Sequence, residues 1–347
     1  MANALTSSSR VIGREYPDPG ENAIISEMID LTLKQVTELA KNSRALRQVH
    51  TKMHAVFKGE FIIEKNLPED LKIGLFKEEK SFPAWIRYSN GKTGILHDKK
   101  PDTRGMAIKL MNVQGGKLLE SHRNENTLDL VMSASPMFFA KDLKSFKGLL
   151  KASIKGTPHV ILFLLLGHWK MAYTTFTKIM IKCKHMMGLS YFSGTPYQFG
   201  DETRAVKYHL TPSASNQLEY TDQNDFDYLR KNIVATLNKH EQYFDFFIQF
   251  QTDADKMPIE DASVVWTSPF IKVARLRIPV QKFDTPDQDI FGDNLTFNIW
   301  HTLPEHRPLG GFNRGRKFIY EALYKFRSNK NNIIKAEPVA TADFFNN

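Results

Sequence analysis

Residues 105–133 read GMAIKLMNVQGGKLLESHRNENTLDLVMS, and this stretch decides the fold class. It contains two short segments, GMAIKLMNV (105–113) and TLDLVMS (127–133), in which apolar and polar residues partly alternate. Such alternation is typical of β-strands with one buried face. The stretch therefore predicts two strands separated by a polar connection.

Five further segments of the same kind lie on either side of this stretch. They are AVFKGEFIIE (55–64), AWIRYSN (84–90), AVKYHLT (205–211), YFDFFIQF (243–250) and FIKVARLRIPV (270–280). Helical patterns occur at 22–42, 67–77, 140–151, 223–239 and 314–327. Seven or eight strands without a regular βαβ alternation favour an antiparallel sheet closed into a barrel, with helices packed outside it. We therefore predict an α+β fold.

The chain of 347 residues has no Pro/Gly/Ser-rich linker between its polar ends. We predict one domain over 21–328, a polar N-terminal tail over 1–20 and a C-terminal tail over 329–347. The first 19 residues lack the apolar stretch of a secretory signal, and Cys183 is the only cysteine. A lone cysteine cannot form an intramolecular disulfide, so we expect a cytoplasmic protein.

The net charge of +9 is concentrated in one segment. Between residues 140 and 190 there are nine lysines and one acid, Asp142, together with the longest apolar run, 160–166. Basic residues between bulky apolar ones suit an amphiphilic anion or an anionic membrane surface better than a nucleic acid. We expect no nucleic-acid partner, and peripheral membrane contact through 141–187 is one reading. The other is a core-packing helix with lysines on its solvated face.

Most catalytic signatures are absent from the sequence. It has no phosphate-binding glycine loop, no G-x-S-x-G elbow and no C-x-x-C pair. His50 and His54 lie four residues apart, but the residues between them lack the glutamate that a zincin helix needs as a base. Nucleotide-binding, serine-hydrolase and zincin chemistry therefore lose support.

A tyrosine with an arginine four residues before it suggests haem chemistry. Arg316 and Tyr320 lie in RGRKFIYEALYKFR (314–327), a predicted helix in which residues four apart share one face. A phenol with a pKa near 10 stays deprotonated at neutral pH only where a cation or metal stabilises it. Tyrosinate is a known axial ligand of haem iron. A second such pair, Arg204 and Tyr208, lies in a predicted strand, where four residues span about 13 Å and separate the two groups.

Four separated blocks resemble the haem catalases, most closely their small catalase-like relatives. The blocks are RQVHTK (47–52), PDTRGMAIKL (101–110), LDLVMSASPMFFAKD (128–142) and GRKFIYEALYKFR (315–327). The similarity runs from about residue 44 to residue 327, and FNIWHTLPEHRPLGGFNRGR (297–316) resembles the small branch. The resemblance implies an eight-stranded antiparallel β-barrel, with haem b held between the barrel and outer helices.

The resemblance also implies roles for individual residues. Tyr320 would be the iron ligand, and Arg316 would keep it phenolate. His50 would be the distal base, although a shift in alignment would give that role to His54. A base at this position would move a proton from the inner to the outer oxygen of a hydroperoxide.

The remaining implied residues would hold the porphyrin. Arg47, Arg104 and Arg327 match arginines that bind the haem propionates, and a planar guanidinium suits a carboxylate. Phe138 follows the distal turn, and Phe146 matches an aromatic residue that packs on the porphyrin. By itself each phenylalanine would be a core residue.

One departure from the catalase pattern bears on the reaction. Ser133 stands where catalases have the asparagine that orients peroxide, and its side chain is shorter. We expect peroxidase-type or organic-hydroperoxide chemistry rather than fast hydrogen peroxide dismutation. A fatty-acid hydroperoxide-converting enzyme of the allene oxide synthase type is an alternative, as are a non-catalytic haem-binding protein and a basic, haem-free membrane-associated protein. By analogy we expect a monomer or a homodimer.

Overall fold

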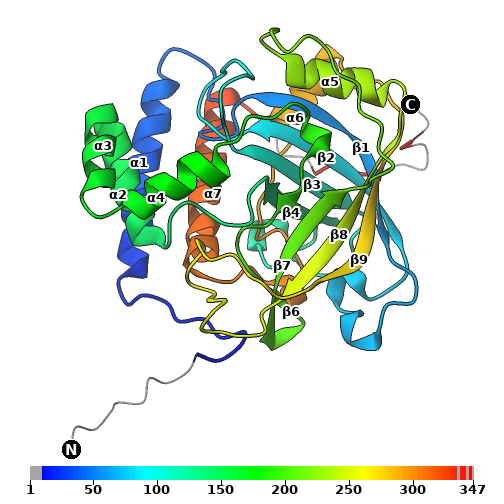
Figure 1. The fold of residues 1–347 in the computed structure, drawn as a ribbon, viewed down its shortest axis with the longest axis horizontal. Coiled ribbons are helices and arrows are strands. Elements are labelled where there is room, and N and C mark those ends of the chain that lie inside the picture. Colours follow the sequence, from blue (N-terminus) through cyan, green and yellow to red (C-terminus); the bar gives the residue numbers. More distant parts are fainter. Residues whose placement is uncertain (1–9, 334–336, 341–343, 346–347) are drawn as a thin grey trace, which may run out of the picture.

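A computed structural model describes residues 10–333, 337–340 and 344–345. Within these residues, nine strands form one antiparallel sheet (Figure 1). The strands are β1 (Met53–Ile63), β2 (Ser81–Asn90), β3 (Arg104–Met111), β4 (Thr127–Ser133), β5 (Tyr191–Phe192), β6 (Tyr197–Phe199), β7 (Asp201–Pro212), β8 (Gln242–Phe250) and β9 (Phe270–Ile278). All seven predicted strands are present, and the short β5 and β6 were not predicted.

Eight of the strands close into a barrel. Their order is β5-β4-β3-β2-β1-β9-β8-β7, and β5 also pairs with β7, which completes the circle, while β6 extends the edge of β7. The two-residue β5 makes this closure, because Phe192 pairs with both Ser133 of β4 and His209 of β7. The predicted α+β barrel with outer helices is confirmed.

The alternation of side chains separates the barrel interior from its outer face. Six interior positions of β2 and β3 are fully buried and apolar, namely Ala84, Ile86, Tyr88, Met106, Ile108 and Leu110. The residues between them, such as Arg87 and Ala107, point outward because successive side chains of a strand alternate between faces. Arg87 and Ala107 are direct partners in the β2–β3 ladder, so they lie side by side on the outer face.

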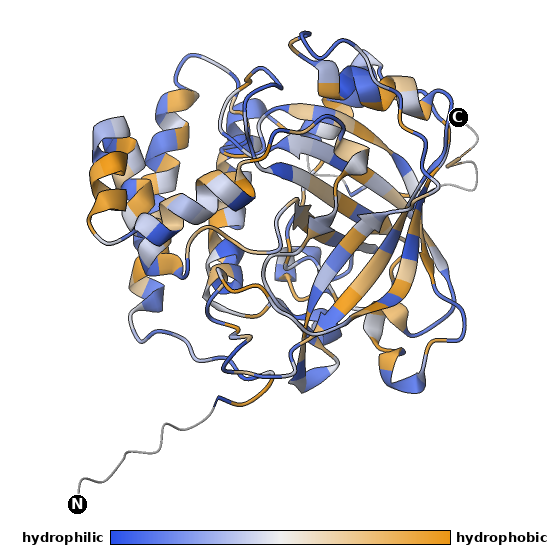
Figure 2. Cartoon of the chain, in the orientation of Figure 1, coloured by the Kyte–Doolittle hydropathy of each residue, from blue (hydrophilic) through white to orange (hydrophobic). Residues whose placement is uncertain are grey.

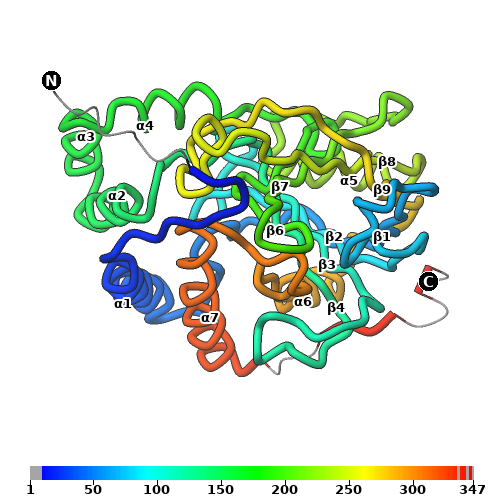
Figure 3. The backbone as a smooth tube through the Cα atoms, turned by 90° about the horizontal axis from the view of Figure 1, so that it is seen from below, coloured from blue at the N-terminus to red at the C-terminus, as the bar shows by residue number. Residues whose placement is uncertain are grey.

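Helices cover the barrel on two sides. On one side lie α1 (Glu21–Leu39), α2 (Leu143–Lys155), α3 (Thr157–Leu165), α4 (Trp169–Thr174) and α7 (Gly311–Asn331). The others are α5 (Tyr228–Leu237) and α6 (Pro286–Asn294). Figure 3 shows the first group as a separate layer beside the barrel. Ile25 and Met28 of α1 and Phe312 of α7 share one buried cluster, which holds this layer together.

Four of the five predicted helices match the structure. The helical patterns at 22–42, 140–151, 223–239 and 314–327 correspond to α1, α2, α5 and α7. The pattern at 67–77 is instead two single 3-10 turns, 69–71 and 74–76, because Gly74, the first residue of the second turn, adopts a positive φ of 53°. A positive φ interrupts a right-handed helix.

The described parts of the predicted tails contact the rest of the chain. Glu15 pairs with Arg307 at 2.6 Å and also with Arg314, and Glu337 lies 2.8 Å from Lys109. Residues 1–9, 334–336, 341–343 and 346–347 of these tails lie outside the described residues. Among the helices described, none has the length and apolar character needed to cross a membrane.

Candidate functional site

A pocket lies between the outer face of the barrel and two helices. Its walls come from β2, β3 and β4, from α1 and α7, and from the loop before β1. Pockets that combine apolar walls with a few polar groups are typical of small-molecule and cofactor sites. Its polar lining includes Arg47, His50, Arg87, Tyr320 and Arg327, which come from distant parts of the sequence.

Residues 87–91, at the end of β2, hold His50 in place. The backbone N–H of His50 donates to the carbonyl oxygen of Gly91 at 3.0 Å, and its carbonyl oxygen accepts from Arg87 at 3.0 Å. Its Nδ1 lies 3.0 Å from the hydroxyl of Ser89. Among the described residues no hydrogen bond engages its Nε2. The ring is thus fixed through one nitrogen, and the other is left for a ligand in the pocket.

The backbone at His50 is strained, and its ring lies against a glycine. His50 has a φ of 57°, in the left-handed region that L residues seldom adopt. A Cβ on Gly105 would lie 2.5 Å from the Nδ1 and Cε1 of His50, so only glycine fits at this point of β3. Strain of this kind costs of order 1–3 kcal/mol and gathers at functional sites. The surrounding bonds thus fix His50 in one orientation.

His50 is neutral throughout the physiological range. Burial lowers the pKa of His50 to about 3, and the positive charges of Arg87, Arg316 and Arg47 add to this effect. A neutral imidazole can accept a proton, which an imidazolium cannot. The low pKa therefore keeps His50 in the form that has a nitrogen able to accept a hydrogen bond or a proton.

Three arginines meet at one end of the pocket. Arg47 and Arg327 donate to the carbonyl oxygen of Asp293, at 3.1 and 2.9 Å, and Arg47 also donates to that of Leu295. Arg87 is buried, and its Nε has no hydrogen-bond partner among the described residues. The guanidinium groups are thus held by neutral carbonyls, and the carboxylate of Asp293 offsets their positive charge only in part.

The positive charges repel one another. Burial lowers the pKa of Arg47 well below its usual value, and the neighbouring Arg87 and Arg327 lower it further. Burial likewise lowers the pKa of Arg87 to about 10, against the opposing effect of Asp293. Buried charges of one sign are stable only where opposite charge compensates them. The arrangement therefore favours an anionic ligand.

Tyr320 reaches the pocket from α7, the helix predicted around it. Arg316 lies one turn earlier on the same helix, with its guanidinium 3.4 Å from the hydroxyl of Thr195 and 3.5 Å from the Oδ1 of Asn313. It does not line the pocket. Its charge still acts locally, since it partly offsets the rise in the pKa of Tyr197 that burial causes.

Arg104, which was predicted to bind a propionate, does not line the pocket. It is fully buried at the start of β3, where it donates to the Oδ1 of Asn90 and to the carbonyl oxygens of Asp98 and Lys100. Successive side chains of a strand point to opposite faces, so Arg104 and Gly105 cannot both face the pocket. Arg104 points to the opposite face from Gly105.

The third pocket arginine is Arg87, which the sequence analysis missed. Arg87 and Ser89 occupy alternate positions of AWIRYSN, and both reach the pocket from the outer face of β2. An arginine among apolar residues in a predicted strand was the available signal. The sequence did not say which face of the strand would meet the helices.

Three other predicted site residues do not line the pocket. Phe138 and Phe146 pack on each other, with ring centroids 5.6 Å apart, in the cluster that joins α1, α2 and α7. Both phenylalanines are therefore core residues, which is the alternative that the sequence analysis gave for each of them. Ser133 pairs with Gly105 across β3 and β4, so its side chain shares the outer face with the pocket residues without being one of them.

The alternative histidine and the alternative arginine–tyrosine pair both lie outside the pocket. His54 is fully buried, with Nε2 2.7 Å from the Oδ1 of Asn90. Burial lowers the pKa of His54 to about 4. Arg204 and Tyr208 lie on β7, as predicted, and Arg204 donates to the carbonyl oxygen of Asp70 at 2.7 Å. Of the alternatives weighed, only His50 and Tyr320 reach the pocket.

A second buried polar group, the ionic cluster, lies farther along the outer face of β3 and β4. Lys109 lies 2.6 Å from Asp129 and 2.8 Å from Glu337. His301 lies 3.6 Å from Asp129, and His122 lies 3.6 Å from Glu337. The ligand atoms of His122, His301 and Glu337 lie within 4.8 Å of one another, but Lys109 already supplies a cation to this carboxylate.

The fold matches that of solved catalases. A fungal catalase and catalase A from Saccharomyces cerevisiae each superpose with a TM-score of 0.64 and 17% identity, over 94% of this chain and 67% and 69% of theirs. A bacterial catalase superposes with a TM-score of 0.63 and 17% identity, over 95% of this chain and 66% of its own. No protein-family model and no curated protein sequence matches. The chain therefore has the catalase fold, a closed eight-stranded antiparallel barrel with flanking helices.

Proposed function

We propose that this protein is a haem-dependent enzyme that metabolises hydroperoxides. The observation that carries the proposal is the meeting of Tyr320, His50 and three arginines in one pocket. A haem with two propionates requires three kinds of group. A phenol can bind the iron, a neutral imidazole can accept a proton from the substrate, and a positive region can bind the propionates.

The residues of the pocket fit this cofactor. Arg47, Arg87 and Arg327 would bind the propionates, since Asp293 offsets their positive charge only in part and the buried Nε of Arg87 has no hydrogen-bond partner among the described residues. Tyr320 would be the iron ligand. The walls of the pocket are apolar, as a porphyrin requires; they include Val36, Val49, Met106, Val131, Phe297 and Leu323. When bound, the haem would supply the electrons for cleavage of the O–O bond, and a second peroxide or a reducing co-substrate would return them.

His50 would move the proton in this reaction. Its Nε2 would accept the proton of the hydroperoxide and return it to the outer oxygen, so that water or an alcohol leaves. The bond from Nδ1 to Ser89 would hold the ring in position for both transfers. Because the pKa of His50 is about 3, the proton does not stay on the imidazole.

The absence of a long amide side chain at Ser133 favours organic hydroperoxides over hydrogen peroxide. A serine hydroxyl donates one hydrogen bond and reaches less far than an asparagine amide. We expect Ser133→Asn to raise hydrogen peroxide turnover, and an unchanged turnover would contradict this part of the proposal.

Fatty-acid hydroperoxides are the second candidate substrate class. The basic and apolar segment 141–187 suits an amphiphilic anion such as a fatty-acid hydroperoxide better than a small peroxide. An enzyme of this type would convert a polyunsaturated fatty-acid hydroperoxide to an epoxide or ketone without consuming a reductant. Product analysis with linoleic or arachidonic acid hydroperoxide distinguishes it from a peroxidase.

The first experiment is a visible spectrum of the protein expressed with a haem precursor. We expect a Soret band with the features of a ferric tyrosinate, which Tyr320→Phe abolishes or shifts. Tyr324→Phe is the matched control, because Tyr324 also lines the pocket and lies one turn away on α7. A colourless protein that also fails to bind added haemin would overturn the proposal. A normal Soret band without peroxide turnover would instead identify a non-catalytic haem-binding protein.

A further inference from the structure

The outer edge of the helical layer carries a continuous apolar surface. We call it the apolar ridge, and it consists of Ile161, Leu162, Leu165, Leu166, Trp169, Tyr173 and Phe176. Leu165, Leu166 and Phe176 are 73%, 71% and 69% exposed. Figure 2 shows α3 in the colour of hydrophobic residues at the edge of the molecule farthest from the barrel. Exposed apolar groups gathered in this way mark an interaction surface.

The apolar ridge is not part of the hydrophobic core, although α3 packs firmly on the neighbouring helix. None of the residues of α3 is buried, and the helix attaches through Phe163 and Leu164 alone among its apolar residues. The ring of Phe163 packs closely on Gly148 of α2, since a Cβ on Gly148 would lie only 2.6 Å from the ring. The same ring stacks on the imidazole of His168, with ring centroids 4.0 Å apart. This close attachment turns the opposite face of α3 to the solvent.

The segment that carries the ridge also carries lysines without acidic partners among the described residues. Lys147 and Lys151 pair with Glu27 of α1. The other seven lysines of the segment are exposed, and no ion pair engages any of them among the described residues; they are Lys141, Lys144, Lys155, Lys170, Lys178, Lys182 and Lys184. The only acid, Asp142, caps α2 by accepting from the backbone N–H of Ser145 at 2.8 Å. The segment that carries the ridge is therefore strongly positive.

We propose that the apolar ridge inserts into the surface of a membrane that contains anionic phospholipids. Leucine and tryptophan side chains enter the boundary between headgroups and acyl chains, and lysines at the same level bind the headgroup phosphates. The nine residues of α3 extend about 14 Å, which is too short to cross a bilayer, so the helix lies in the plane of the surface. A nucleic acid would leave the leucines without a partner.

The test measures binding of the full chain to vesicles. Phosphatidylcholine vesicles with 30% phosphatidylglycerol are compared with vesicles of phosphatidylcholine alone, by co-sedimentation and by fluorescence. Trp169 is 61% exposed, so its emission should shift to the blue on the anionic vesicles, and Trp169→Phe should abolish the shift. We expect at least tenfold stronger binding to the anionic vesicles, and we expect high salt to weaken it.

Two sets of variants separate the apolar and the charged contributions. Leu165→Glu with Leu166→Glu should weaken binding at least tenfold. Lys155→Gln, Lys170→Gln and Lys178→Gln together should weaken it about a hundredfold, since each lysine near an anionic surface strengthens binding about fivefold. All five side chains are exposed, so the fold should not depend on them.

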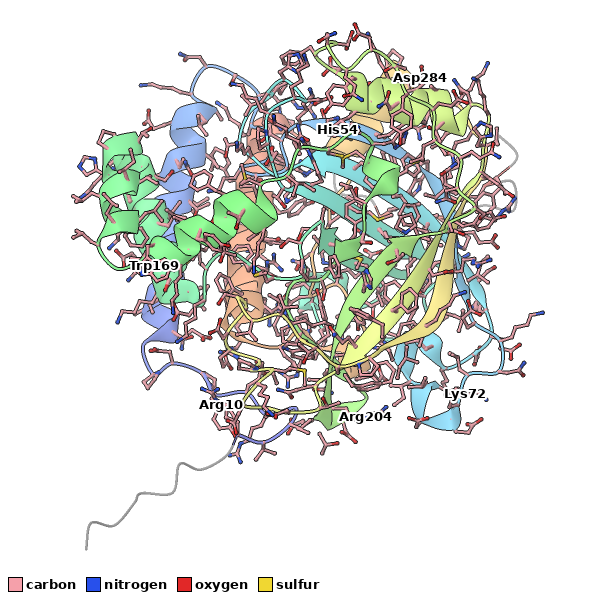
Figure 4. The ribbon with its side chains drawn as sticks, in the orientation of Figure 1. Arg10, His54, Lys72, Trp169, Arg204 and Asp284 are labelled. Atoms are coloured by element: carbon pink, nitrogen blue, oxygen red, sulfur yellow. The ribbon has the colours of Figure 1, made fainter. Side chains whose placement is uncertain are left out.

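Matched controls lie elsewhere on the molecule. Ile290→Glu replaces an apolar residue of α6 that is 55% exposed. Lys77→Gln with Lys80→Gln removes two exposed lysines from the segment near Lys72, which Figure 4 shows on the side opposite Trp169. These variants should bind as the wild type does.

Three results would overturn the proposal. The first is a wild type that shows no preference for anionic vesicles, and the second is a loss of binding in the control variants as large as that in the ridge variants. The third is a dimer in gel filtration that Leu165→Glu with Leu166→Glu dissociates, without vesicle binding by the wild type, because a second copy would then cover the ridge. The vesicle assay needs no haem, so its outcome is independent of the proposed function.

Discussion

The arginine pocket and the ionic cluster occupy the same outer face of β3 and β4, yet their charges are arranged in opposite ways. At Gly105 and Ala107 the face meets three guanidinium groups that carbonyl oxygens hold. At Lys109, four residues farther along the same strand, one ammonium lies between two carboxylates. In the ionic cluster the chain's own carboxylates pair with the one ammonium, whereas in the pocket the positive charges outnumber the carboxylates.

The difference teaches how to separate a structural site from a ligand site. Burial acts to lower the pKa of Lys109, but Asp129 and Glu337 outweigh it, and the pKa is raised. In the pocket Asp293 acts to raise the pKa of Arg47, but burial and the neighbouring arginines outweigh it, and the pKa is lowered. Both regions are buried and polar, so burial alone does not distinguish them. The balance of charge does.

The largest expected effect comes from breaking the balanced region. Lys109→Met leaves two buried carboxylates without a counter-charge, and it should lower the free energy of unfolding by about 3–5 kcal/mol. Urea unfolding of the haem-free protein measures this. Lys272→Met is the matched control, because Lys272 also bridges two carboxylates, Glu64 at 2.8 Å and Asp245 at 3.0 Å, but is partly exposed. It should cost less than about 1 kcal/mol, and equal losses for the two variants would contradict the comparison.

The pH dependence tests the neutral state of His50. The unfolded chain binds a proton at His50 below about pH 6.5, whereas the folded chain does so only below about pH 3. Stability therefore rises with pH in this window, and the contribution is complete above pH 6.5 and lost as the pH falls. The slope from this residue is at most about 1.4 kcal/mol per pH unit. In urea unfolding between pH 4.5 and 6, His50→Gln should reduce the slope, and an unchanged slope would mean that His50 is protonated in the pocket.

The third prediction concerns the unbalanced region. Arg87→Met removes the hydrogen bond to the carbonyl of His50, but it also removes one of three positive charges that repel one another. The two effects offset each other, so the free energy of unfolding of the haem-free protein should change by less than about 1 kcal/mol. Haemin affinity, measured by Soret titration, should fall about tenfold, which corresponds to about 1.4 kcal/mol. Arg275→Met, on the outer surface of β9, should leave haemin affinity unchanged. A stability loss as large as that of Lys109→Met would show that the pocket is balanced without a ligand.

The smallest expected effect is on the support of His50. Ser89→Ala removes the partner of Nδ1 and should cost about 1 kcal/mol in urea unfolding, the usual net contribution of one hydrogen bond. Ser81→Ala, at the exposed end of the same strand, is the control. If both variants have the same stability, the contact between Ser89 and His50 does not hold the ring.

The strands and most helices were predictable from the sequence because local patterns determine them. The alternation in 105–113 and 127–133 shows which side chains share a face, and α1 and α7 show helical spacing. The two-residue β5 has no pattern of its own, because it exists only through its pairing with β4 and β7. Barrel closure therefore could not be located from the sequence.

The site was predictable where it depends on one element and not where it depends on two. Tyr320 and Arg327 lie on one helix, and both reach the pocket. Whether Arg87 or Arg104 reaches the pocket depends on which face of the barrel packs against α7. That packing is part of the tertiary structure, and local sequence patterns do not show it. Phe138 and Phe146 show the same limit, since an aromatic residue can pack on a core or on a cofactor with equal ease.

The pairing of β1 with β9 sets the order in which the molecule can be made. Glu60 pairs with Arg277, so the barrel cannot close until nearly all of the chain has left the ribosome. Contacts between such distant residues make folding slow, and they leave strand edges open meanwhile. The leucines of α3 are synthesised well before β9, so the nascent chain presents them together with an unfinished barrel. We therefore expect production of this protein in cells to depend more strongly on chaperones than its final stability would suggest.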